Sequence, residues 1–107
     1  MAFAFAYATR MSNNPLNPTE IETALKDLPH WEHADDALKT EIKLDDFSQA
    51  LGLITRIGLL AEKADHHPEL FNVYNTIRIS LSTHDADGKV TRKDVDLARE
   101  IASLLPR

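Results

Sequence analysis

The sequence predicts an α+β fold, in which about three helices pack on one face of a mostly antiparallel sheet of three or four strands. Three segments carry apolar residues at the spacing of an amphipathic helix, and the segments between them alternate apolar and polar residues as half-buried strands do. The order is helix, two strands, helix, one or two strands, helix. This order favours helices that cover one side of an antiparallel sheet.

The first predicted helix spans residues 18–28. Asn17 supplies an N-cap, Pro18 occupies the first helical position and Glu20 can reach back to the cap. Pro29 ends the segment. The apolar residues at helical spacing are Ile21, Ala24, Leu25 and Leu28.

Two strands are expected next. Residues 37–44 alternate with a period of two, which predicts a strand with one face against the core and one face in water. Residues 31–34 are expected to form the preceding strand, and Asp35 and Asp36 are expected to form the turn. The apolar face of the longer strand carries Leu38, Thr40, Ile42 and Leu44.

The longest predicted helix runs from Asp46 to about Asp65. Its apolar stripe is unusually wide, which suggests burial against the sheet and against something else. Gly52 and Gly58 weaken a helix, and they are easier to understand if another backbone packs close to them. A neighbouring copy of the chain is one candidate for that second partner.

The last third of the chain predicts one or two strands and a final helix. Alternation returns over residues 71–83, but Asn75 interrupts the apolar face, so the segment is either one strand or two. Thr91 and Asp94 then have the spacing of a capping box in front of the last amphipathic helix.

Length and composition restrict the class of protein. With 107 residues, of which 43% are apolar, we expect one domain over residues 12–107. A net charge of −5 without a basic patch argues against direct binding of nucleic acid. The absence of cysteine excludes disulfides, and no apolar stretch approaches the ~18 residues that span a membrane. We expect a cytoplasmic protein, with a nuclear or organellar location left open.

Residues 1–11 are expected to stand apart from this domain. Alanine alternates with Phe3, Phe5 and Tyr7, and Met11 offers a second start. An extra edge strand, a targeting leader and an upstream extension all fit this pattern. A secretory signal fits it poorly, because no basic stretch precedes the apolar residues.

Three of the five histidines fall at the ends of predicted elements. His66 and His67 close the long helix, and His84 follows the second strand region. Such positions can line a shared cleft, and imidazoles exchange protons near neutral pH. Glu62 precedes His66 by four residues, which on a helix places both on one face and lets the carboxylate hold the ring. These residues form a candidate acid–base site.

Two other interpretations of the histidines remain open at this point. His66, His67 and Pro68 would also make an ordinary polar end of a helix. Three imidazoles with Glu62 or Asp65 could bind zinc or iron, but their spacing matches none of the known zinc signatures. We therefore expect no metal ion.

The segment around these histidines resembles the pterin-4a-carbinolamine dehydratases. Residues 61–84 read AEKADHHPELFNVYNTIRISLSTH, which carries that family's pattern of an acidic residue, three positions, His-His-Pro, an aromatic residue and a histidine after a strand. The likeness extends over about residues 20–105 and includes Trp31. The matching positions are Glu62, His66, His67, Pro68, Tyr74 and His84, with Asp94 as the downstream acid.

The resemblance implies an activity, an assembly and a set of roles. Members dehydrate 4a-hydroxytetrahydropterins to the quinonoid dihydropterin without a metal or redox cofactor, which recycles the cofactor of aromatic amino-acid hydroxylases. They assemble as homodimers or homotetramers of an αβ fold. For this chain the resemblance implies that His66 and His84 exchange the protons, His67 positions the pterin, and Glu62 orients the imidazoles.

Departures from the family pattern leave two roles and two functions open. Residues 86–90 are one residue longer than is common, so Asp94 is either a substrate-orienting acid or only the capping partner of Thr91. Trp31 either borders the cleft or lies in the core. A dimerisation cofactor for a transcription factor, known for animal members, and a pterin role in molybdopterin metabolism are the alternatives. The complete set of histidines favours the enzyme.

Overall fold

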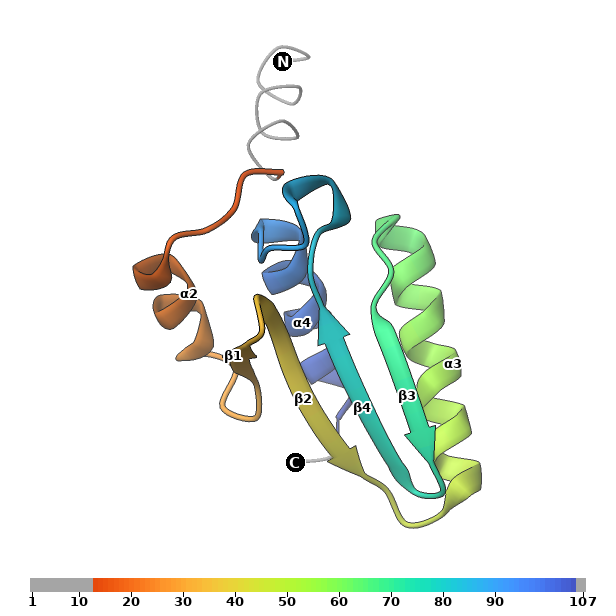
Figure 1. The fold of residues 1–107 in the computed structure, drawn as a ribbon. Coiled ribbons are helices and arrows are strands. Elements are labelled where there is room, and N and C mark those ends of the chain that lie inside the picture. The colour runs from red at the N-terminus through yellow and green to blue at the C-terminus, as the bar shows by residue number, and fades with distance from the viewer. Residues whose placement is uncertain (1–12, 106–107) are drawn as a thin grey trace.

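The computed structural model describes residues 13–105, which form a four-stranded antiparallel sheet and three α-helices (Figure 1). The strands lie in the order β1-β2-β4-β3. The predicted α+β class is therefore confirmed. The expected extension over residues 1–11 lies outside the described part of the chain.

The four strands form two hairpins that meet in the middle of the sheet. The first hairpin turns at Asp35 and Asp36, which have φ values of 54° and 60°. Two successive residues with positive φ fit a tight two-residue hairpin turn. The central pair, β2 and β4, runs from Leu38 opposite Leu81 to Lys43 opposite Thr76. The strands are β1 (Glu32–Ala34), β2 (Ala37–Lys43), β3 (Glu69–Val73) and β4 (Thr76–Leu81).

Asn75 explains why the second strand region divides in two. The chain turns at Tyr74 and Asn75, and Val73 pairs with Thr76 across the turn. The Asn75 side-chain amide donates to the carbonyl of Leu44 at 2.9 Å, and the Leu44 amide donates to the Asn75 carbonyl at 2.8 Å. The polar residue that interrupts the apolar face thus ties this hairpin to the end of β2.

Three helices complete the core. Helices α3 (Phe47–Ala64) and α4 (Arg92–Leu104) cover one face of the sheet, whereas α2 (Pro18–Leu25) lies beside β1 (Figure 1). Helix α2 is shorter than the predicted 18–28, because its last turns tighten to hydrogen bonds three residues back, as from the Leu28 amide to the Leu25 carbonyl. The centre of the core contains Leu38, Ile57, Ile77, Ile79, Leu81, Val95, Leu97 and Ile101.

Helix α3 buries only one side of its wide apolar stripe within this chain. Its buried residues face the sheet, but Phe47, Leu51 and Leu59 are exposed, the last to 68%. Nothing lies within 4 Å of a Cβ built on Gly52 or Gly58. The second partner expected from the sequence is therefore not part of the described chain, residues 13–105.

Candidate functional site

The candidate histidines gather where three elements end. Helix α3 ends at Ala64, β4 ends at Leu81 and α4 begins at Arg92, all at the same end of the sheet (Figure 1). A cleft of about 250 Å³ opens between them. This volume is slightly below the ~300 Å³ at which ligand pockets usually begin, so a bound bicyclic molecule would stay partly exposed. The lining includes His66, His67, His84, Ser82, Thr83 and Lys93.

The end of α3 separates the two adjacent histidines. Asp65 adopts the left-handed conformation with φ 51°, and the His66 amide donates to the carbonyl of Ala61 at 3.1 Å. This is a common way for a helix to stop, and it turns the chain sharply. The two imidazoles consequently point to different partners, although they are neighbours in sequence.

Glu62 contacts His67 and not His66, which corrects the expectation from helical spacing. Its Oε1 lies 2.9 Å from His67 Nε2. The four-residue rule places side chains on one face only while the helix continues, and the helix has ended before His66. Both partners are exposed, so the ion pair itself contributes little stability.

His66 is held by Asp94, and this pair is buried, unlike the pair of His67 and Glu62. The distance between His66 Nε2 and Asp94 Oδ1 is 2.5 Å. The His66 side chain is 10% exposed and that of Asp94 is completely buried. A carboxylate bonded to one ring nitrogen orients an imidazole and stabilises the imidazolium that forms when the other nitrogen accepts a proton.

Asp94 also fulfils the capping role that the sequence offered as the alternative. Its Oδ2 accepts from the Thr91 amide at 2.9 Å, and the Thr91 side chain caps α4 in return. The capping box and the histidine contact are therefore both present, one on each carboxylate oxygen. The two roles, which were alternatives on sequence alone, are combined in one side chain.

Thr83 belongs to the same network and was missed in the sequence. Its hydroxyl donates to Asp94 Oδ2 at 2.8 Å and lies 2.6 Å from the Thr91 hydroxyl. One signal was available, because Thr83 continues the alternation of Ile77, Ile79 and Leu81 and so falls on the buried face. A buried hydroxyl needs a hydrogen-bond partner.

His84 lines the cleft from the opposite side. It is the first residue of a short 3₁₀ turn, η1 (His84–Ala86), and its side chain is exposed. Among residues 13–105, no hydrogen bond to its ring is found. His84 is thus free to face a ligand in the cleft.

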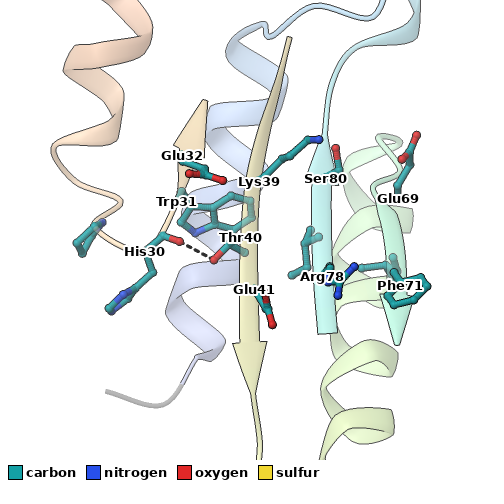
Figure 2. Close-up of a pocket in the computed structure, with 13 residues that line it drawn as sticks. His30, Trp31, Glu32, Lys39, Thr40, Glu41, Glu69, Phe71, Arg78 and Ser80 are labelled. Carbon is teal, nitrogen blue, oxygen red and sulfur yellow. Dashed lines mark hydrogen bonds between the residues drawn. The ribbon is translucent and has the colours of Figure 1, made fainter. Parts of the chain in front are cut away.

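Trp31 does not line the histidine cleft, and of its two expected places the structure shows the core. Its ring is 6% exposed and packs in the core cluster. The chain before β1 is fixed over the sheet by a 2.6 Å hydrogen bond from the Thr40 hydroxyl to the His30 carbonyl (Figure 2). This segment lies beside the middle of β2 (Figure 2).

A second and larger hollow surrounds Trp31 on the open face of the sheet (Figure 2). Its volume is about 830 Å³, and Arg78 stacks over Phe71 there at 5.0 Å from the ring centre. None of His66, His67 and His84 lines it. The larger hollow and the candidate histidines therefore lie at different places in this protein.

Metal ligands and membrane segments can be assessed from the geometry of residues 13–105. No group of three or more His, Asp or Glu side chains in this range is placed to hold a metal ion. In the same range, no helix combines the length and apolar character needed to cross a bilayer.

Comparison with known proteins identifies the family. The family model described as Pterin 4 alpha carbinolamine dehydratase matches residues 14–104. This chain belongs to the pterin-4a-carbinolamine dehydratase family. The match covers β4, α3, α4 and the whole histidine cleft, so the family assignment and the site concern the same part of the molecule.

Several relatives of the dehydratase family share most of their length with this chain. A protein of Burkholderia orbicola (strain MC0-3) named "Putative pterin-4-alpha-carbinolamine dehydratase" is 48% identical over 88 residues, which cover 80% of this chain and 85% of the relative. A Novosphingobium aromaticivorans protein of the same name is 46% identical over 92 residues, covering 84% of this chain and 95% of the relative.

The fold of the family is also matched by a crystal structure. A protein from Brucella melitensis, described as a transcriptional coactivator/pterin dehydratase, aligns with a TM-score of 0.82 and 38% sequence identity. The alignment covers 87% of this chain and 100% of that one.

Proposed function

We propose that this chain dehydrates a pterin-4a-carbinolamine to the quinonoid dihydropterin and water. The observation that carries the proposal is the family match over residues 14–104, which includes a cleft lined by three histidines. Relatives of nearly half identical sequence bear the name of this dehydratase. The carboxylate-held imidazole in the cleft is a group suited to proton transfer at neutral pH.

The reaction needs one proton acceptor and one proton donor. A base removes the proton from the ring nitrogen, the electron pair forms a carbon–nitrogen double bond, and the carbon–oxygen bond breaks as an acid protonates the leaving hydroxyl. His66 is the proposed base, because Asp94 stabilises the charge it gains. His84 is the proposed acid, since its exposed ring faces the cleft without another partner in the described chain.

The remaining site residues are proposed to bind the substrate. His67, held by Glu62, positions the pterin at the mouth of the cleft. Asp94 orients His66 from inside the protein and does not itself touch the substrate, because its side chain is completely buried. No role in substrate binding is proposed for Trp31, which lines a different hollow.

We further propose that the enzyme acts as a cytoplasmic homo-oligomer in the recycling of a pterin cofactor of aromatic amino-acid hydroxylases. Phe47, Leu51 and Leu59 on the outer side of α3 are exposed apolar residues that a second copy can cover. The two open positions at Gly52 and Gly58 would allow a close approach of the partner helix. A homodimer and a homotetramer both fit this surface.

A transcriptional partner is the second candidate function, suggested by the description of the Brucella melitensis protein. The same outer side of α3 would serve that partner. The enclosed pairing of His66 with Asp94 favours the enzyme, because a surface used only for docking does not need it.

The experiment that tests the enzyme is a stopped-flow assay with chemically generated carbinolamine. We expect the full chain to accelerate dehydration, and His66→Ala and His84→Ala to lower kcat by about 10²-fold or more, as loss of an acid or base does. His33→Ala is the matched control, because His33 is an exposed histidine on β1 outside the cleft. Equal rates for wild type and both folded cleft variants would overturn the assignment.

A further inference from the structure

We infer that Thr83 and Thr91 are positioning residues: they hold the Asp94 carboxylate with Oδ1 toward His66 Nε2, and so leave Nδ1 as the nitrogen that accepts the proton. The inference rests on the proposed function for its catalytic meaning, although the tautomer can be measured without any assay of activity. The two threonines act through Asp94, to which both are hydrogen bonded.

The network is buried and its hydrogen bonds have a single consistent direction. Thr83, Thr91 and Asp94 are exposed by 3%, 0% and 0%. An ionised carboxylate only accepts hydrogen bonds, so the single hydroxyl hydrogen of Thr83 goes to Asp94 Oδ2. The 2.6 Å contact between the two hydroxyls must then be donated by Thr91. Thr91 Oγ1 in turn accepts from the Lys93 amide at 3.2 Å.

The ionised Asp94 sets which nitrogen of His66 donates, because a carboxylate only accepts. The threonines set which of its oxygens faces the ring. Both donors from the threonines, the Thr83 hydroxyl and the Thr91 amide, occupy Asp94 Oδ2. The other oxygen, Oδ1, remains for His66 Nε2, which must carry a hydrogen to donate to it. A neutral His66 therefore has its lone pair on Nδ1. A network that fixes one nitrogen as the donor fixes the other as the base.

Thr83 is itself held in place by its backbone. Its amide donates to the Lys89 carbonyl at 2.9 Å, and its carbonyl accepts from the amides of Ala86 and Gly88 at 3.0 Å each. The hydroxyl is thus presented from a fixed point at the end of β4. Without it, Asp94 Oδ2 would lose one of its two donors, and the carboxylate could rotate so that Oδ1 no longer faces His66 Nε2. The ring would then have no fixed acceptor for its hydrogen.

The loss of this control should appear in the rate. Reacting groups must be held to within about 1 Å, and a misplacement of that size can cost ~10²-fold. We expect Thr83→Val, which keeps the shape but removes the hydroxyl, to lower kcat by about 10- to 100-fold with KM changed by less than about twofold. Thr83→Ser, which keeps the hydroxyl, should retain most of the wild-type kcat.

The deciding measurement is ¹⁵N NMR of the histidine side chains in the full chain, at a pH where His66 is neutral. We expect the wild type and Thr83→Ser to show His66 as the Nε2–H tautomer, and Thr83→Val to show a mixture with Nδ1–H. Thr40→Val is the matched control, because Thr40 also has a buried, hydrogen-bonded hydroxyl but lies outside the cleft. It should leave the His66 resonances and kcat unchanged.

Two results would overturn the inference. One is an Nδ1–H tautomer of His66 in the wild type, which needs no variant to fold. The other is a folded Thr83→Val that keeps both the tautomer and kcat, which would leave Thr83 with a merely structural role. Failure of the proposed function gives a different pattern: the wild type would not accelerate dehydration, while Thr83→Val would still change the tautomer.

Discussion

Replacement of Asp94 by asparagine changes the one carboxylate that both caps α4 and holds His66. Oδ1 contacts His66 Nε2, and Oδ2 accepts from the Thr83 hydroxyl and the Thr91 amide. Asparagine keeps the shape but exchanges one acceptor for an NH₂ group. Whichever way the amide turns, an NH₂ group then faces either the imidazole N–H or the two donors at Oδ2.

The expected loss of stability follows from these contacts. A buried donor left without an acceptor costs about 1–3 kcal/mol, and a weakened N-cap costs about 0.5–2 kcal/mol. We therefore expect Asp94→Asn to lower the free energy of unfolding by about 1.5–5 kcal/mol. In a domain of this size each kcal/mol lowers Tm by about 4–8 °C, so Tm should fall by at least ~6 °C. The folded fraction should also lose kcat by about 10²-fold, because His66 is no longer held as a base.

The assay combines urea unfolding with the stopped-flow dehydration rate. Asn17→Ala is the matched control, because Asn17 caps α2 through the Glu20 amide but is exposed and far from the histidines in sequence. It should cost about 1 kcal/mol and leave kcat unchanged. The reasoning is refuted if Asp94→Asn destabilises no more than Asn17→Ala and retains most of its rate.

Three further predictions concern the surface of the molecule. Glu62→Gln should change the free energy of unfolding by less than ~1 kcal/mol, because Glu62 is exposed. It should raise KM more than it lowers kcat, since Glu62 holds His67, the proposed substrate-positioning residue. Urea unfolding and steady-state kinetics measure these effects, and a fall in kcat at constant KM would contradict the prediction. Leu59→Glu should leave the circular dichroism spectrum unchanged but dissociate the proposed oligomer, because Leu59 is exposed on α3; an unchanged sedimentation coefficient would exclude this surface. The hydrogen bond and charge of Lys39 lower the pKa of Asp35, so the pair stabilises the fold above the ordinary carboxyl pKa and loses this effect as pH falls through the lowered value. Lys39→Met should let the pKa of Asp35 rise, as an NMR titration can show; a constant pKa would be evidence against the pairing.

The apolar periodicity and the capping and turn residues predicted the helices and strands, because these signals depend on residues close in sequence. The capping residues Asn17 and Thr91 mark real helix starts, and Asp35-Asp36 marks a real hairpin. The division of the second strand region was left open, because the partner of Asn75 is the backbone of Leu44, which lies 31 residues away. Contacts at such a distance are not expressed in local spacing.

The sequence predicted that the three histidines would share a cleft, but it did not predict their carboxylate partners. Glu62 and His66 fit helical spacing, but the left-handed Asp65 ends the helix between them. Asp94 lies 28 residues from His66, and only the packing of α4 against α3 brings the two together. The position of Thr83 depends on the same tertiary arrangement. Residue types thus indicated the chemistry, whereas the fold determined which carboxylate serves which ring.

The reversal at Asp65 makes the two adjacent histidines into different residues. One ring is enclosed and faces Asp94, whereas the other stays in solvent beside Glu62. Their identities are the same, so their places along the junction between α3 and β3 decide which ring is enclosed against Asp94. A deletion of one residue in this junction would change the surroundings of both rings without removing either imidazole. In designed variants of this site, the length of the junction between α3 and β3 therefore matters more than its residue composition.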